Sequence, residues 1–148
     1  MKRIIILMIF LISLSACGAD PDQFTEVNGP EKEAIEDFLL KYKETMVEAV
    51  NTGDFNELEG YLITNNSFYH SLRRYISDSH SENITKELNH FEVITVYEDE
   101  IGEFHIDVNE KVTLFEYGEA KPVERAVRFE VITGGNGSYR VVTIKERK

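Results

Sequence analysis

The sequence predicts an α+β domain in which three N-terminal helices pack on an antiparallel sheet of four strands. Between residue 31 and about residue 80, apolar residues recur every three or four positions, which is typical of amphipathic helices. After about Asn89 the period falls to two, and glycine-rich turns separate runs of β-branched and aromatic residues. Helices that precede and stay apart from antiparallel strands define the α+β class.

The helices are expected where apolar stripes meet capping residues. The first begins near Glu31 with a cluster of acidic residues, as the helix dipole favours, and Gly53 is placed to end it. Asp54 is expected to cap a short second helix, and Ser67 a third. The stripe of the first helix consists of Ile35, Phe38, Leu39, Tyr42, Met46, Ala49 and Val50.

The second half of the chain predicts a meander. Strands are expected over 91–98, 104–114, 123–131 and 139–144, with turns at Gly102, at Gly118–Pro122 and at Gly134–Gly137.

The N-terminus predicts export. Two cations precede the apolar run Ile4–Leu14, and small residues follow, so residues 1–16 are expected to be a signal peptide. The run is too short to span a bilayer, which takes roughly 20 residues. Leu14-Ser15-Ala16-Cys17 resembles the lipobox of bacterial lipoproteins, which implies cleavage before Cys17 and its modification with fatty acyl chains such as palmitate. The alternative is an ordinary signal peptide followed by an incidental cysteine.

Composition and charge narrow the setting further. Residues 17–30 are mostly polar and are expected to form a lipidated tether between the outer face of the cell membrane and the domain. The net charge of −11 would repel a phosphate backbone, so no nucleic-acid partner is expected.

Several motifs resemble a known family. Ala49-Val50-Asn51-Thr52-Gly53-Asp54-Phe55, Ser67-Phe68-Tyr69 and Val108-Asn109-Glu110-Lys111-Val112 resemble the C-terminal NTF2-like domain of TcaA, a membrane protein of Gram-positive bacteria associated with teicoplanin resistance. The resemblance implies that residues 31–148 form a cone-shaped NTF2-like domain with a curved sheet, acting as a non-catalytic module of the cell envelope. TcaA proteins also carry a cysteine zinc ribbon and a transmembrane helix. This chain has one cysteine, so what those parts do, drug resistance included, is not carried over.

Glu110 is the first candidate for chemistry within the cone. It falls in the apolar phase of its strand, and the expected hairpin would place it opposite Phe129. Desolvation would raise the pKa of its carboxyl and make it a base or a ligand contact. The alternative is structural: a β-bulge near Asn109 turns it outward, or a partner such as Arg125 or a tyrosine neutralises it. Arg125 is itself expected to pair across the hairpin with Glu116 near the rim.

Tyrosines and one histidine on the helices are the remaining candidates. Tyr42, Tyr61 and Tyr69 are expected to close the cone, either as pocket-lining residues or as ordinary core residues. His70 would be an acid or base beside a cone carboxylate, or a surface histidine. The other histidines are scattered without the spacing of a metal site, so neither a metal nor a cofactor is expected.

Three functions are open for these residues, and one of them is a passive domain that only spaces or oligomerises. The leading one is a lipid-anchored envelope protein that binds peptidoglycan fragments, another membrane protein or a small hydrophobic molecule without catalysis. The competing one is a small-molecule enzyme that uses Glu110 in the cone, with Tyr42 or His70.

Overall fold

The computed structural model describes residues 23–148, so the predicted signal peptide and Cys17 lie outside the described residues. Three helices precede most of a sheet whose strands run in the order β1-β2-β3-β4-β5, and each neighbouring pair is antiparallel. The α+β class is confirmed. The elements are α1 (Pro30–Thr52), α2 (Asn56–Glu59), α3 (Ser67–Ser81), β1 (Thr25–Glu26), β2 (Thr85–Glu98), β3 (Phe104–Glu116), β4 (Glu119–Thr133) and β5 (Tyr139–Glu146).

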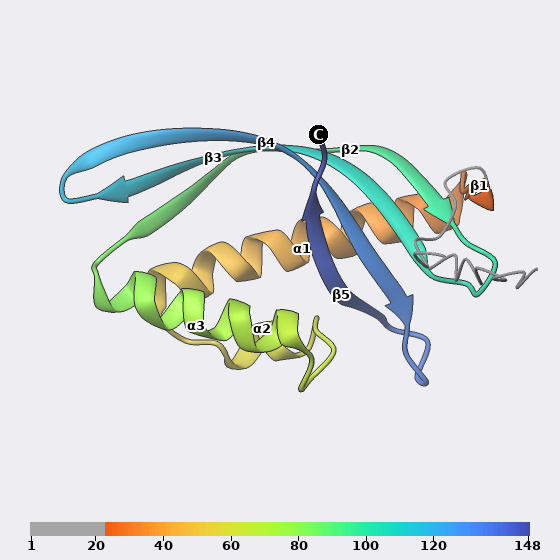
Figure 1. The fold of residues 1–148 in the computed structure, drawn as a ribbon, viewed down its shortest axis with the longest axis horizontal. Helices are drawn as coiled ribbons and strands as arrows, with labels where there is room; N and C mark the ends of the chain where they lie inside the picture. Colours follow the sequence, from red (N-terminus) through yellow and green to blue (C-terminus); the bar gives the residue numbers. More distant parts are fainter. Residues whose placement is uncertain (1–22) are drawn as a thin grey trace, which may run out of the picture.

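The sheet is strongly curved and arches over α1, with α2 and α3 on the far side of that helix (Figure 1). The core fills the space between the concave face and α1. Its fully buried side chains include Ile35, Leu39 and Val50 from α1 and Ile106, Val108 and Phe129 from the sheet.

The motif after α1 has a packing reason at each position. Gly53 ends the helix in the left-handed region, at φ 77°, and its N–H donates to the carbonyl of Ala49. A Cβ at this position would lie 2.7 Å from the ring of His80 on α3, so the glycine also lets the two helices approach. Asp54 Oδ1 accepts from the N–H of Asn56 at the entry to α2, but the N-cap position of that helix is Phe55 rather than the predicted Asp54. The third helix is capped by Asn66 rather than Ser67, because the Asn66 side chain accepts from the N–H of Tyr69.

The strands are longer than the sequence predicts. β2 begins at Thr85, and bulges between Leu88 and His90 and between Val93 and Thr95 each shift the inward-facing set by one residue. The alternation of apolar and polar residues is therefore broken twice, and the sequence pattern does not reveal the part of β2 before Phe91. The predicted turn at Gly118–Pro122 is also shorter, because β4 already begins at Glu119. Pro122 pairs with Thr113 of β3, and β5 pairs with β4 only from Val127 onward. No described strand therefore needs a hydrogen bond from the N–H that proline lacks on that side.

A fifth strand lies in the segment predicted to be a tether. Thr25 and Glu26 pair with Glu98 and Tyr97, and the adjacent Val27 is buried. The described residues thus form five strands rather than the expected four. A strand of two exposed polar residues shows no alternation of apolar and polar residues from which it could be predicted. No helix within residues 23–148 is both long and apolar enough to cross a membrane.

Candidate functional site

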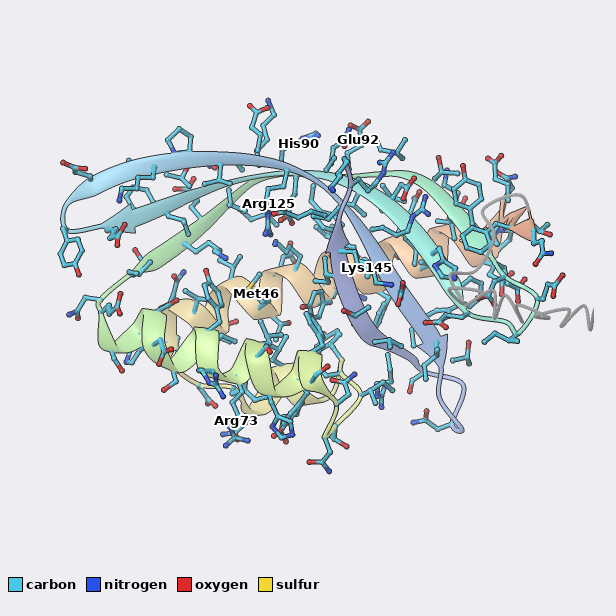
Figure 2. All side chains as sticks on the ribbon, viewed as in Figure 1. Met46, Arg73, His90, Glu92, Arg125 and Lys145 are labelled. Atoms are coloured by element: carbon cyan, nitrogen blue, oxygen red, sulfur yellow. The ribbon has the colours of Figure 1, made fainter. Side chains whose placement is uncertain are left out.

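A cavity of about 320 Å³ lies between the concave face of the sheet and helices α1 and α3. Most of its wall is apolar, and four charged side chains also line it: Lys43, Lys86, Arg125 and Glu146. Figure 2 shows Arg125 reaching from β4 toward α1, with Met46 on the helix below it. The apolar wall includes Met46, Phe68, Leu72, Val112, Leu114, Val123, Val127 and Ile144.

An ion-paired carboxylate lies beside this cavity. Glu110 is 2% exposed, and its Oε2 lies 2.6 Å from the Nζ of Lys43 on α1. Its Oε1 accepts from Arg125 Nε at 3.0 Å and also from Arg125 Nη2. Burial works to raise the pKa of the Glu110 carboxyl, but Lys43 and Arg125 outweigh it and hold that pKa below the ordinary value. We call Lys43, Glu110 and Arg125 the ion triad.

Lys86 is a second buried cation, and it has no such partner. It is 7% exposed, and no carboxylate within residues 23–148 comes within 4 Å of its Nζ. The ammonium lies 4.8 Å from the centre of the Tyr75 ring. Burial lowers the pKa of Lys86 to about 8, and repulsion from Arg125 acts in the same direction.

The backbone of Lys86 is held by a side chain of α1. The amide of Asn51 donates to the Lys86 carbonyl at 2.9 Å, and its oxygen accepts from the Lys86 N–H at 2.7 Å. Within residues 23–148, β1 pairs with β2 only at Tyr97 and Glu98, so no described strand lies beside the outer edge of β2 at Lys86. Asn51 thus supplies both hydrogen bonds that a strand would supply, and it fixes where Lys86 enters the cavity.

Tyr42 also lines this cavity, and its hydroxyl is unsatisfied. Its side chain is fully buried, and its Oη has no hydrogen-bond partner among residues 23–148. Burial, with a contribution from Glu110, raises the pKa of Tyr42 well above its ordinary value, so the hydroxyl keeps its proton. It is a donor in need of an acceptor.

The predicted site residues separate into two groups. Tyr42 and Arg125 line the cavity and Glu110 pairs with Arg125, while whether any of them contacts a ligand stays a prediction. Tyr69 instead packs against Phe55, and its hydroxyl donates a hydrogen bond to the Glu59 carboxylate. His70 is exposed.

Two details of the predicted cone are wrong, and the structure decides between the two interpretations of Glu110. Glu110 lies opposite Arg125, whereas Phe129 lies opposite Ile106, because the turn after β3 is shorter than predicted. Arg125 therefore pairs with Glu110, and Glu116 pairs with Lys121 instead. Of the two interpretations of Glu110, the structure agrees with the structural one, in which Arg125 is its partner. Two cations hold the pKa of its carboxyl below the ordinary value, so the rise that belonged to the other interpretation does not occur.

Sequence reasoning missed both buried lysines. Lys43 continues the stripe of α1, four residues after Leu39 and three before Met46, so a cation inside an apolar helical stripe was the available signal. Lys86 points to the same face of β2 as Leu88, two residues on. The bulge after Leu88 breaks the alternation of apolar and polar residues, so this part of the strand was not predicted.

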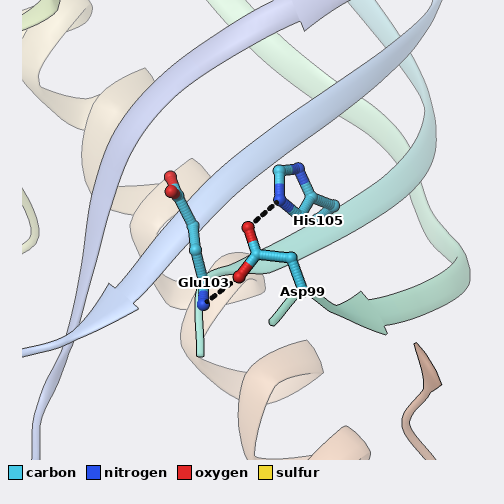
Figure 3. A group of neighbouring side chains, drawn as sticks. All are labelled: Asp99, Glu103 and His105. Carbon is cyan, nitrogen blue, oxygen red and sulfur yellow. Dashed lines mark hydrogen bonds and ion pairs between the residues drawn. The ribbon is translucent and has the colours of Figure 1, made fainter. Parts of the chain in front are cut away.

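A second cluster lies at the turn between β2 and β3. Asp99, Glu103 and His105 each have an atom that could bind a metal, and these atoms lie within 4.8 Å of one another. The spacing of the histidines along the sequence did not indicate this cluster. Figure 3 shows the Asp99 carboxylate between the His105 ring and the Glu103 amide. Asp99 Oδ2 lies 3.0 Å from His105 Nε2, and Oδ1 accepts from the N–H groups of Ile101 and Glu103.

These bonds close the turn. Burial works to raise the pKa of Asp99, but the bonds from His105 and the two amides outweigh it and lower that pKa. Phe24 stacks on His105 at 4.3 Å, which ties the segment before β1 to the same turn. The residue types are those that bind divalent metals, but both carboxylate oxygens of Asp99 are already engaged by His105 and by the backbone.

Comparisons with known proteins identify the family and the fold of this chain. A protein of Alkalihalophilus pseudofirmus named as uncharacterized is 55% identical over 143 residues, covering 95% of this chain and 94% of its own. Among solved structures, the intermembrane space region of the chloroplast protein ARC6 has a TM-score of 0.62 at 10% identity, covering 78% of this chain and 96% of that one. A Catenulispora acidiphila protein has a TM-score of 0.62 at 12% identity, covering 79% and 93%.

The structure of Aln2 from a Streptomyces species has a TM-score of 0.55 at 12% identity, covering 81% of this chain and 93% of that one. At such low identities these structures show a shared fold and nothing more. The sequence profile of the TcaA protein NTF2-like domain matches residues 31–145, which is most of the chain. The chain therefore belongs to the TcaA NTF2-like domain family.

Proposed function

We propose that this protein is a lipid-anchored module on the outer face of the cell membrane, whose NTF2-like domain binds a small molecule in its cavity without catalysis. The observation that carries the proposal is the pairing of Glu110 with both Lys43 and Arg125 beside an apolar cavity. Apolar walls with a few converging polar groups are typical of small-molecule sites.

The ion triad argues against catalysis by Glu110. A general base needs a carboxylate that can take up a proton near the working pH. Two cations hold the pKa of Glu110 below its ordinary value, and so they stabilise the ionised form. The other members of the enzyme hypothesis add nothing at this carboxylate, since His70 is exposed and Tyr42 retains its proton.

The anchor rests on the sequence before the described residues. We expect the chain to fractionate with membranes and Cys17→Ala to be released from them, because acyl chains on Cys17 would provide the attachment. Membrane fractionation and labelling with a clickable palmitate analogue test this. A Cys17→Ala variant that stays membrane-bound and unprocessed would show that Cys17 is not the anchor.

Binding is tested by filling the cavity. Leu114 lines the cavity, and its neighbour Phe115 is exposed outside it, so Leu114→Trp and Phe115→Trp form a matched pair. The full chain is purified and extracted with organic solvent, and the extracts are compared by mass spectrometry. We expect a compound that wild type and Phe115→Trp retain and Leu114→Trp loses. Identical extracts from all three proteins would contradict a ligand-binding cavity.

A further inference from the structure

We propose that the cavity takes an organic anion with an apolar body, whose carboxylate or phosphate group lies against Lys86, Arg125 and Tyr42. This inference rests on the proposed function, since it names the chemical class of that small molecule. It starts from two polar groups of residues that line the cavity. The hydroxyl of Tyr42 has no hydrogen-bond partner among residues 23–148, and the ammonium of Lys86 lies over the Tyr75 ring with no carboxylate of that range within 4 Å.

The charge of the cavity is opposite to that of the chain. The protein has a net charge of −11, yet three cations line this cavity: Lys43, Lys86 and Arg125. Glu110 pairs with Lys43 and Arg125 but supplies only one negative charge, and the lining carboxylate, Glu146, is exposed near the end of β5. Even when both carboxylates are counted, the three cations leave one positive charge in excess inside an acidic protein, which selects an anion.

The unanswered groups carry a cost that a bound anion would remove. A buried charge without a partner destabilises the folded state, and so does a buried hydroxyl without an acceptor. A carboxylate or phosphate oxygen would accept from both Lys86 and Tyr42 in charge-assisted or neutral hydrogen bonds. Arg125 already donates through Nε and Nη2 to Glu110, which leaves its other guanidinium donors for the ligand.

The remaining wall requires an apolar body. Met46, Phe68 and Leu72 line the helical side, and Val112, Leu114 and Val127 line the sheet. An inorganic anion would leave these side chains in contact with water, whereas an alkyl or aryl group would cover them. At about 320 Å³ the cavity is within the size range of small-molecule sites.

The test compares ligands of one length and different charge. The full chain in lipid nanodiscs is titrated by calorimetry with octanoate, octyl phosphate, octanol and octylammonium, with empty nanodiscs subtracted. We expect the anions to bind at least about tenfold more tightly than octanol, and octylammonium to bind least. The difference between octanoate and octyl phosphate then identifies which anionic group the site prefers.

Variants locate the effect at Lys86. Lys86→Gln removes the charge and is expected to weaken octanoate binding by about tenfold or more, while octanol binding changes little. Lys86→Arg is expected to keep octanoate binding within a few-fold, which also shows that the position tolerates substitution. Lys41→Gln is the matched control, because Lys41 is an exposed lysine on the same helix as Lys43.

Equal binding of octanoate and octanol, or equal affinities of Lys86→Gln and Lys41→Gln for octanoate, would overturn the anion proposal. So would no binding of octanoate at all. The proposed function would survive these results if Leu114→Trp still loses a neutral compound that Phe115→Trp retains. It would fail only if the extracts are identical, and the two failures are thus distinguishable.

Discussion

The ion triad and Lys86 are two regions of one cavity, and each contains a buried lysine. The lysine of the triad has a carboxylate partner, whereas Lys86 has none in the described part of the chain. Burial lowers the pKa of both Lys43 and Lys86 to about 8. Lys43, however, is 2.6 Å from Glu110, whereas Lys86 lies over the ring of Tyr75, has no carboxylate partner within residues 23–148 and faces repulsion from Arg125. The paired lysine is explained by the fold alone, and the unpaired one is not.

The convex face of the sheet strengthens this contrast. There the buried Asp107 accepts from Arg128 Nε at 2.7 Å and from Nη2 at 3.0 Å, and Arg147 lies 3.4 Å away. Asp99 likewise has its hydrogen bonds to His105 and to the backbone. Since the protein pairs its buried charges at these places, an unpaired charge that lines a cavity marks a place for a ligand.

The largest expected effect comes from breaking the ion triad. Glu110→Gln keeps the shape of the side chain but leaves Lys43 buried without a countercharge, so we expect a loss of about 3–5 kcal/mol in the free energy of unfolding at pH 7. Urea denaturation followed by circular dichroism measures it. Glu124→Gln is the control, because Glu124 pairs with Lys111 at 2.9 Å but is 70% exposed.

The pH dependence of the same pair of proteins sharpens the test. The pKa of Glu110 is lower in the folded than in the unfolded chain, so its contribution is fully present above the ordinary value of 4.5 and is lost as pH falls through the folded pKa. The wild-type and Glu110→Gln stabilities should therefore converge in acid. A constant difference down to the acid transition would mean that the triad does not stabilise through charge.

The sequence predicted the fold better than it predicted this cavity, and the reason lies in register. Period and capping residues identified α1 and the strands from β3 onward, because those signals are local. The pairing of Glu110 with Arg125 depends on the length of the turn at Gly118, and an error of a few residues there moved Glu110 opposite Phe129. Lys86 was missed because two bulges break the alternation of β2.

The second prediction removes the residue that positions Lys86. Asn51→Ala leaves the N–H and carbonyl of Lys86 without their side-chain partner at the edge of β2, and we expect a loss of about 2 kcal/mol in the free energy of unfolding. Octanoate affinity should fall as well, because the Lys86 side chain would start from a less fixed strand end. Thr52→Ala is the neighbouring control, since the Thr52 hydroxyl bonds only within its own turn. Equal octanoate affinities for the two variants would show that Asn51 does not position Lys86.

Replacing Lys86 itself is expected to raise the free energy of unfolding, whereas the two preceding substitutions lower it. Lys86→Met replaces an unpaired buried ammonium with an apolar side chain of similar length, so we expect the domain to gain about 1 kcal/mol at pH 7 while it loses octanoate binding. Thermal unfolding at several pH values measures the gain. A substantial loss of stability would show that the charge of Lys86 is part of the fold.

The pH profile identifies which lysine is responsible. The pKa of Lys43 and of Lys86 is about 8 in the folded chain against 10.5 for a free lysine. Between these values the unfolded chain binds more protons, so wild-type stability should rise with pH over that range. Lys86→Met should keep only the part due to Lys43, whereas Lys41→Gln should keep the whole slope. An unchanged slope in Lys86→Met would mean that Lys86 does not titrate in the cavity.

The smallest expected effect on stability comes from removing the Tyr42 hydroxyl, and it tests whether that hydroxyl serves a ligand or the fold. Tyr42→Phe removes a buried hydroxyl that has no acceptor within residues 23–148 and leaves the ring contact with Phe129 in place. We expect the free energy of unfolding to stay within about 0.5 kcal/mol of wild type, since no hydrogen bond to the described chain is lost. Octanoate affinity should fall a few-fold because the anion loses one donor, while octanol affinity stays unchanged. Tyr117→Phe, at an 82% exposed position, should change neither quantity. A loss of stability in Tyr42→Phe without a loss of affinity would assign the hydroxyl to the fold, and it would leave Lys86 as the one unanswered polar group on which the anion site depends.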